Sequence, residues 1–155
     1  MSRNFYIGLL VIATGIVAIF FYRTESLPPV LEERAGFGGM SLRIEYATTP
    51  EARELGLGGR TEIPKDYGML FVFPVDDYYG FWMEDAMIPL DIFWLDAQGQ
   101  TVFIMADVAT STYPDVFYPT VPARYVLETV AGFTREHDIV IGTQLRLKNF
   151  PSVSQ

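Results

Sequence analysis

The chain contains no cysteine, a single histidine and fewer basic than acidic residues. The absence of cysteine excludes disulfides, thiolate metal sites, a cysteine nucleophile and lipid attachment through an N-terminal cysteine. Because a zinc site usually needs several histidine or cysteine ligands, His137 alone speaks against a transition-metal centre, and no metal site is predicted. No glycine-rich phosphate loop, Gly-x-Ser-x-Gly elbow or Ser/His/Asp arrangement occurs, so the sequence predicts no cofactor.

Positive charge is also scarce: 11 Lys and Arg stand against 19 Asp and Glu, which gives a formal net charge of -8 at pH 7. A strongly acidic chain is repelled by a phosphate backbone and by an anionic lipid surface. Nucleic acid is therefore not a predicted partner. The length of 155 residues suffices for one domain with an ordinary core and a tail.

The N-terminal part of the chain has one long uncharged stretch, residues 4–22. It is long and apolar enough to cross a bilayer as a single helix. A cleaved signal peptide is the alternative, but residues 20–23 are bulky where small residues would mark a cleavage site. Arg3 and the terminal amine give a slight bias toward an inside N-terminus. We predict a single-pass protein of the cell membrane, with its C-terminal domain outside the cytoplasm.

Two further regions follow this membrane anchor. Residues 23–39 contain prolines, glycines and charges with little apolar periodicity, which is typical of a flexible linker. Residues 40–149 carry the patterns of a folded domain. Strands are predicted at 40–46, 68–73, 81–83, 90–95, 101–106, 124–128 and 144–148, and short helices at 48–56 and 130–135.

The order of these elements is mostly strand after strand, with a long surface loop predicted at 107–122. Such an order is typical of all-β architectures rather than of strands alternating with helices. The predicted fold is mainly β: a compact antiparallel barrel or sandwich with two short helices.

Aromatic and acidic residues are most concentrated in residues 67–73 and 80–96, which are predicted to form consecutive strands, and the candidate site is their junction, Glu84 to Asp91. Asp91 stands inside an apolar run, and a buried carboxylate without a partner is costly. Arg60 is its predicted partner. Two interpretations stay open: Asp91 fixes a bend by binding backbone amides or an arginine, or it serves ligand binding or catalysis.

The residues beside Asp91 extend this candidate site. On a strand, Trp82 and Glu84 share a face, whereas Asp85 points away. The aromatic residues within the stretch 80–96 are predicted to be part of the core, or else to form a stacking platform for a flat ligand. Tyrosines on flanking loops could complete a binding rim: Tyr78, Tyr79, Tyr113 and Tyr118. The predicted ligand-binding residues are Arg60, Trp82, Glu84, Asp85 and Asp91.

Four ordered blocks of the sequence are similar to a known family: residues 53–60, 67–73, 81–93 and 123–132. Together they resemble the domain of unknown function 192 family, also called uncharacterised protein family 0127. The resemblance covers essentially the whole folded part. It implies a compact, mostly β domain that is often exported or membrane-tethered, and it implies no established activity.

The chain departs from the family pattern at the candidate site. Members usually have Gly-Leu-Met where this chain has Gly56-Leu57-Gly58, and Trp-Met-Lys-Asn-Thr where it has residues 82–86. Glu84 and Asp85 thus replace a lysine and an asparagine, which reverses the local charge. Two outcomes are therefore expected at this place: the chain binds something different from a typical member, or it binds nothing.

The function favoured by the sequence is non-catalytic binding of a small envelope ligand or a protein partner. One alternative is a hydrolase of envelope carbohydrate that uses Asp91 with Glu84 or Asp85, since glycoside hydrolysis needs one protonated and one ionised carboxyl group. A structural accessory of a membrane complex is the other. The sequence leaves open whether the protein is an enzyme, and no catalytic residue is assigned.

Overall fold

A computed structural model describes residues 33–153 of the chain. The predicted anchor at 4–22 and residues 23–32 of the predicted linker lie outside the described residues. Within residues 33–153, none of the helices is long and apolar enough to span a membrane.

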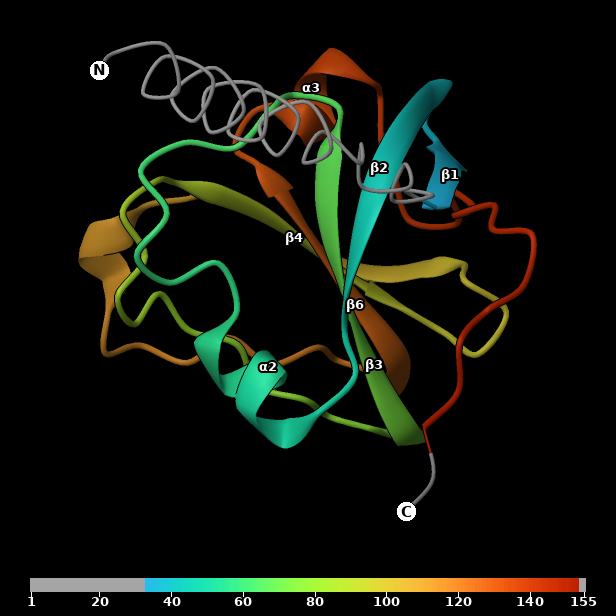
Figure 1. Ribbon diagram of the computed structural model, residues 1–155, viewed down its shortest axis with the longest axis horizontal. Coiled ribbons are helices and arrows are strands. Elements are labelled where there is room, and N and C mark those ends of the chain that lie inside the picture. Colours follow the sequence, from blue (N-terminus) through green and yellow to red (C-terminus); the bar gives the residue numbers. More distant parts are fainter. Residues whose placement is uncertain (1–32, 154–155) are drawn as a thin grey trace, which may run out of the picture. The chain divides into compact units, whose positions relative to one another are not determined.

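One six-stranded sheet forms the described domain, in the order β1-β2-β3-β6-β4-β5 (Figure 1). The strands are β1 (Glu33–Phe37), β2 (Met40–Ala47), β3 (Tyr67–Asp77), β4 (Leu90–Leu95), β5 (Thr101–Val108) and β6 (Ala123–Val130). The helices are α2 (Pro50–Leu55), α3 (Phe133–Glu136) and the 3-10 helix η1 (Thr110–Thr112). The mainly-β class with two short α-helices is confirmed.

Strand β1 corrects the predicted domain boundary, because it occupies part of the predicted linker 23–39. Ala35 and Phe37 are buried in the core, and β1 pairs antiparallel with β2. Gly38 and Gly39 make the tight turn between the two strands with φ of 57° and 80°, a region that glycine enters without strain. The glycines that suggested a linker therefore serve a hairpin.

The sheet is not wholly antiparallel as predicted, because β2 and β3 run parallel. Parallel neighbours need a long crossover connection, and residues 48–66, which include α2, provide it. Thr49 caps α2 by accepting a 3.2 Å hydrogen bond from the Ala52 N–H, and Pro50 begins the helix as predicted. All other strand pairs in the described sheet are antiparallel.

Two other segments differ from their predictions. Residues 74–77 continue β3 beyond its predicted end at residue 73, and an irregularity between Val72 and Asp77 accommodates Pro74 in the strand. Residues 81–83 form no strand; Phe81 makes a single bridge to Phe117 in the loop after β5.

The domain has two hydrophobic clusters, one on each face of the sheet. The first contains Phe93 and Leu127 and is covered by Phe133 of α3. The second contains Trp94 and Val126, with Ala52 of α2 packed against it. Neighbouring residues in a strand point to opposite faces, which is why β4 and β6 contribute to both clusters. Accordingly, α2 and α3 lie on different sides of the sheet (Figure 1).

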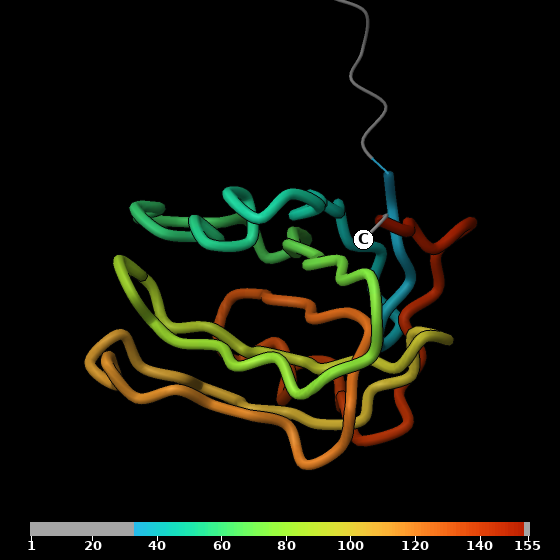
Figure 2. Tube along the Cα trace, turned by 90° about the horizontal axis from the view of Figure 1, so that it is seen from below, coloured from blue at the N-terminus to red at the C-terminus, as the bar shows by residue number. Residues whose placement is uncertain are grey.

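The C-terminal stretch, residues 143–147, bridges the two outer strands and gives the sheet its barrel-like closure. Gly36 of β1 exchanges backbone hydrogen bonds of 2.9 and 2.8 Å with Arg146. On the other side Gln100 pairs with Gln144, and the Thr101 N–H donates to the Thr143 carbonyl at 2.9 Å. Figure 2 shows this stretch running beside β1. The predicted strand at 144–148 is thus a pair of isolated bridges that closes the sheet.

Candidate functional site

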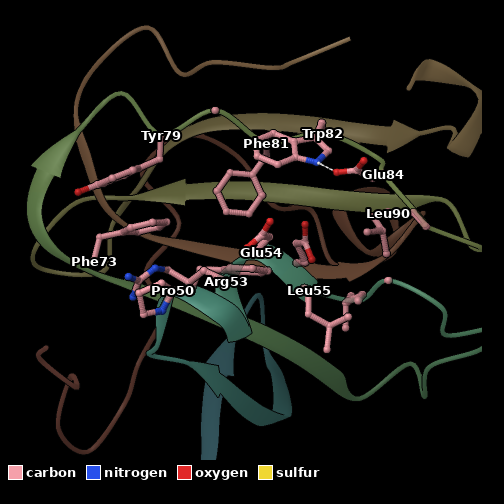
Figure 3. A pocket seen from close by; sticks show the side chains of 17 residues that line it. Pro50, Arg53, Glu54, Leu55, Phe73, Tyr79, Phe81, Trp82, Glu84 and Leu90 are labelled. Atoms are coloured by element: carbon pink, nitrogen blue, oxygen red, sulfur yellow. Dashed lines mark hydrogen bonds between the residues drawn. The ribbon is translucent and has the colours of Figure 1, made fainter. Parts of the chain in front are cut away.

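A cavity of about 400 Å³ lies between α2 and the segment that follows β3 (Figure 3). Side chains of α2, among them Pro50 and Arg53, stand on one side of it, and Tyr79, Phe81 and Trp82 stand on the other. Side chains from β3, β4 and β6 complete the lining. A volume of this size is within the range of small-molecule sites.

Five aromatic side chains line the cavity: Phe71, Phe73, Tyr79, Phe81 and Trp82. Phe71 and Phe81 meet edge to face with ring centroids 4.8 Å apart, and Phe73 and Tyr79 stack at 3.6 Å. Trp94, buried behind them, donates an indole hydrogen bond of 2.8 Å to the Tyr79 carbonyl. These contacts fix the rings, so the apolar wall is preformed.

Glu128 of β6 places a carboxyl group in this aromatic lining. Its residue is 4% exposed, and burial raises the pKa of the carboxyl to about 8. Within residues 33–153 it has no hydrogen-bond or ion-pair partner. Buried polar groups are nearly always partnered, so a neutral acid without a partner beside a cavity marks a candidate ligand contact.

The strand register explains how Glu128 comes to face the cavity. It lies opposite Met69 of β3 and Ile92 of β4, both members of the second hydrophobic cluster. Gly56, just after α2, leaves room above it, because a Cβ built there would lie 3.9 Å from Glu128 Oε2. The sequence analysis missed Glu128, although a lone acid in the apolar run 126–130 is the same signal that singled out Asp91.

Arg53 is the one basic side chain among the described residues that line the cavity. Its Nη1 donates hydrogen bonds of 2.9 Å to the carbonyls of both Thr48 and Val72. The guanidinium carbon lies 5.2 Å from the centroid of the Phe73 ring, a cation–π contact. The positive charge of Arg53 is therefore held by backbone and ring rather than by a carboxylate.

Trp82 and Glu84, which were predicted to share a face, lie together at the rim. The Trp82 indole donates a 3.1 Å hydrogen bond to Glu84 Oε2 (Figure 3). Tyr113 donates a 3.0 Å hydrogen bond to Glu84 Oε1, which raises the pKa of the tyrosine. Because Trp82 and Tyr113 are 42% and 49% exposed, this rim is accessible from solvent.

Asp85 belongs to the bend beside the rim, not to the cavity. Its backbone has φ of 53°, and its carbonyl accepts a 2.9 Å hydrogen bond from the Gly59 N–H. Its exposed side chain lines an adjoining surface depression, together with Glu84. Asp85 therefore lies outside the cavity but shares the depression with Glu84, and strand parity does not explain this because residues 81–83 form no strand.

Asp91 is buried, as predicted, but its predicted partner was wrong. Both of its oxygens accept hydrogen bonds from backbone N–H groups: Oδ1 from Asp107 at 2.7 Å and from Gly132 at 3.3 Å, and Oδ2 from Thr134 at 2.6 Å. Its neighbours in β4, Leu90 and Ile92, belong to the cavity-side cluster, so alternation directs Asp91 to the opposite face. Of the two open interpretations, the structure supports the one in which Asp91 binds backbone amides.

Arg60 interacts elsewhere. It forms a bidentate ion pair with Glu45 at 2.8 and 3.1 Å. It is not a partner of Asp91, whose hydrogen bonds come from backbone N–H groups. Its Nη1 also lies 2.7 Å from the Tyr67 hydroxyl, which donates a hydrogen bond to Glu45. The hydrogen bond from Arg60 lowers the pKa of Glu45. Arg60 therefore secures β2 to the loop before β3 and does not line the cavity.

The charges around the cavity are mainly negative. Glu54 and Glu84 line it together with the uncharged carboxyl of Glu128, against Arg53 alone among the described lining residues. Across residues 33–153, no group of three or more His, Cys, Asp or Glu side chains is placed to hold a metal ion. The site is thus an aromatic pocket with carboxyl groups at its wall and rim.

The fold and this pocket define a mainly-β domain with an aromatic cavity of small-molecule size. The DUF192 family model, described as Uncharacterized ACR, COG1430, matches residues 33–147. The chain therefore belongs to the DUF192 family, the family whose motifs its sequence resembles.

Two solved structures have a fold similar to that of this chain. A protein from Sinorhizobium meliloti 1021 proposed to be a transcription regulator has a TM-score of 0.70 and 28% identity, covering 74% of this chain and 92% of its own. A protein of unknown function from Novosphingobium aromaticivorans DSM 12444 has a TM-score of 0.67 and 27% identity, covering 78% and 91%. No curated protein matches the chain.

Proposed function

We propose that the domain is a non-catalytic binding module for a small organic ligand. The observation that carries this proposal is the unpartnered Glu128 carboxyl in the wall of a preformed aromatic cavity. Apolar pockets with a few polar groups are the usual form of ligand sites. A protein partner, the other ligand considered, has less support, since Glu128 lies too deep for a flat surface to reach.

We also propose that the module lies outside the cytoplasm, tethered to the cell membrane by residues 4–22. The support is the uncharged sequence of that stretch and the bulky residues that follow it. An envelope location would make the ligand a molecule of the cell surface or the surroundings.

A thermal-shift screen tests the binding function. The full-length chain in lipid nanodiscs is screened against a library of small aromatic, cationic, anionic and sugar-like fragments. A ligand that binds only the folded state stabilises it by about 2.7 kcal/mol at 100 times its dissociation constant. Genuine ligands should raise the melting temperature of the wild-type protein.

A cavity-blocking variant makes this screen specific. Ala86 lines the cavity, and the larger side chain of Ala86→Phe should occupy part of its volume and abolish the shifts. Ala97→Phe, in the turn between β4 and β5, is the matched control and should keep them. A screen without hits, or hits that persist in Ala86→Phe, would contradict the proposal.

A hydrolase is the second candidate, because the pKa of about 8 keeps Glu128 protonated at neutral pH, as a general acid requires. Glu54 and Glu84 line the same cavity and could supply the ionised carboxylate. Asp91, the acid first considered for this role, lies on the other face of the sheet. Turnover of an oligosaccharide that disappears in Glu128→Gln while ligand binding persists would favour the enzyme.

A further inference from the structure

We infer that the cavity takes a small organic ammonium ion, whose positive charge pairs with the Glu128 carboxylate while its carbon skeleton lies against the surrounding aromatic rings. This inference rests on the proposed binding function and names the chemical class of the ligand. Three independent features of the site lead to it.

The first feature is the missing partner of Glu128. Within residues 33–153 the carboxyl has no hydrogen-bond donor or cation beside it, although only 4% of the residue is exposed to solvent. A buried carboxylate is stable only when a cation or several donors reach it. In this cavity the ligand is the remaining source of such a group.

The second feature is the sign of the surrounding charges. Arg53 and Glu54 on α2, Tyr79 after β3 and Glu84 before β4 are the titratable groups that share the cavity with Glu128. The one cation among them is already bound to two carbonyls and a ring. Because carboxyl groups outnumber it, an anionic ligand would be repelled and a cationic ligand attracted.

The third feature is the aromatic lining. Phe71 and Phe81 meet edge to face, and Tyr79 stacks on Phe73, so the cavity presents ring surfaces from several directions. Ring faces attract ammonium groups, and aromatic cages recognise quaternary ammonium ions in this way. The same rings bury the hydrocarbon part of the ligand.

Proton release follows from this pairing. The free site holds Glu128 protonated below about pH 8, whereas an ammonium ligand requires the carboxylate. Binding must therefore expel the proton, and affinity should increase about tenfold between pH 6 and pH 7 and level off above pH 8. The other charged lining groups do not reverse this direction, since Glu54 and Glu84 are acidic and Arg53 is already bound to two carbonyls and a ring.

Isothermal titration of the full-length chain in nanodiscs tests the inference with three small aromatic probes that differ in charge. Benzyltrimethylammonium carries a fixed positive charge at every pH, benzyl alcohol is neutral and benzoate is anionic. We expect the cation to bind at least tenfold more tightly than either other probe. Its binding should release protons, strengthen from pH 6 to pH 8 and weaken at least tenfold in Glu128→Gln.

Controls separate the possible failures. Glu62→Gln, an exposed glutamate outside the cavity, should bind the cation as the wild type does. If benzyl alcohol or benzoate binds as well as the cation and Ala86→Phe blocks it, the ammonium inference is overturned and the binding function stands. If none of the probes and no fragment of the library binds, both are overturned.

Discussion

Thr134 donates its backbone N–H to Asp91 Oδ2 across 2.6 Å, and this hydrogen bond joins strand β4 to the first turn of α3. The other oxygen of Asp91 holds the N–H groups of Asp107 and Gly132. One buried side chain thus fixes the end of β5, the turn after β6 and the start of a helix. This role explains a carboxylate in an apolar strand without any ligand.

Replacing Asp91 should therefore destabilise the fold. In Asp91→Asn, an amide group must face one of the N–H donors, so a buried donor loses its acceptor, which costs about 1–3 kcal/mol. Urea unfolding followed by tryptophan fluorescence measures the change in unfolding free energy. Asp115→Asn, an exposed aspartate, is the matched control and should change it by less than about 0.5 kcal/mol. Equal stability of the two variants would contradict the assigned role.

Glu128 should make stability depend on pH in the direction opposite to most carboxylates. Burial raises its pKa to about 8 in the folded state, whereas an unfolded glutamate has a pKa of about 4.3. Between these values the folded state binds one more proton, so this group's contribution to stability falls by about 1.4 kcal/mol per pH unit as the pH rises. Below about pH 4.3 the contribution is fully present.

A comparison of variants isolates the contribution of Glu128 to the pH dependence of the unfolding free energy. The unfolding free energy of Glu128→Gln minus that of the wild type should increase between pH 5 and pH 7, because glutamine does not titrate. The same difference for exposed Glu62→Gln should stay nearly constant. A flat difference for Glu128→Gln would show that its carboxyl is ionised in the folded protein.

Trp82 should contribute to binding more than to stability. Its indole lines the cavity and contacts Glu84, yet 42% of its surface is exposed. In Trp82→Ala we expect about tenfold weaker binding of benzyltrimethylammonium and a stability loss below about 1 kcal/mol. Tyr78→Ala, exposed but outside the cavity, should leave both unchanged. Unchanged affinity in Trp82→Ala would remove the rim from the site.

The predicted membrane orientation can be tested because the chain lacks cysteine. A single Gln98→Cys substitution places a thiol in the exposed turn between β4 and β5. In intact cells a membrane-impermeant maleimide should label Gln98→Cys but not Ser2→Cys, which should react only after lysis. The reverse pattern would place the domain in the cytoplasm.

Much of the fold could be predicted because local patterns determine it. Alternation gave β2 almost to the residue, and the apolar run 90–95 is β4. Strand β1 was missed because its glycines resemble a linker, and only pairing with β2 reveals their purpose. The parallel arrangement of β2 and β3 depends on which strands become neighbours, a long-range choice that no local pattern contains.

The site was predicted less well for a related reason. Trp82 and Glu84 do lie together, joined by a hydrogen bond, but residues 81–83 form no strand, and Asp85 shares a surface depression with Glu84. A buried acid in a strand can face either side of the sheet, and the sequence does not show on which side a cavity lies. Asp91 was therefore chosen, whereas Glu128, which faces the cavity, was passed over.

The stretch 143–147 supplies backbone partners to Gly36 of β1 and to Gln100, which directly precedes β5. β1 and β5 are the two edge strands of the sheet. A premature stop codon before Thr143 would leave amide and carbonyl groups unpaired on both sides at once. Exposed edge strands of this kind form hydrogen bonds with strands of other chains. Such a shortened product is expected to self-associate during synthesis, even with the whole aromatic pocket still encoded.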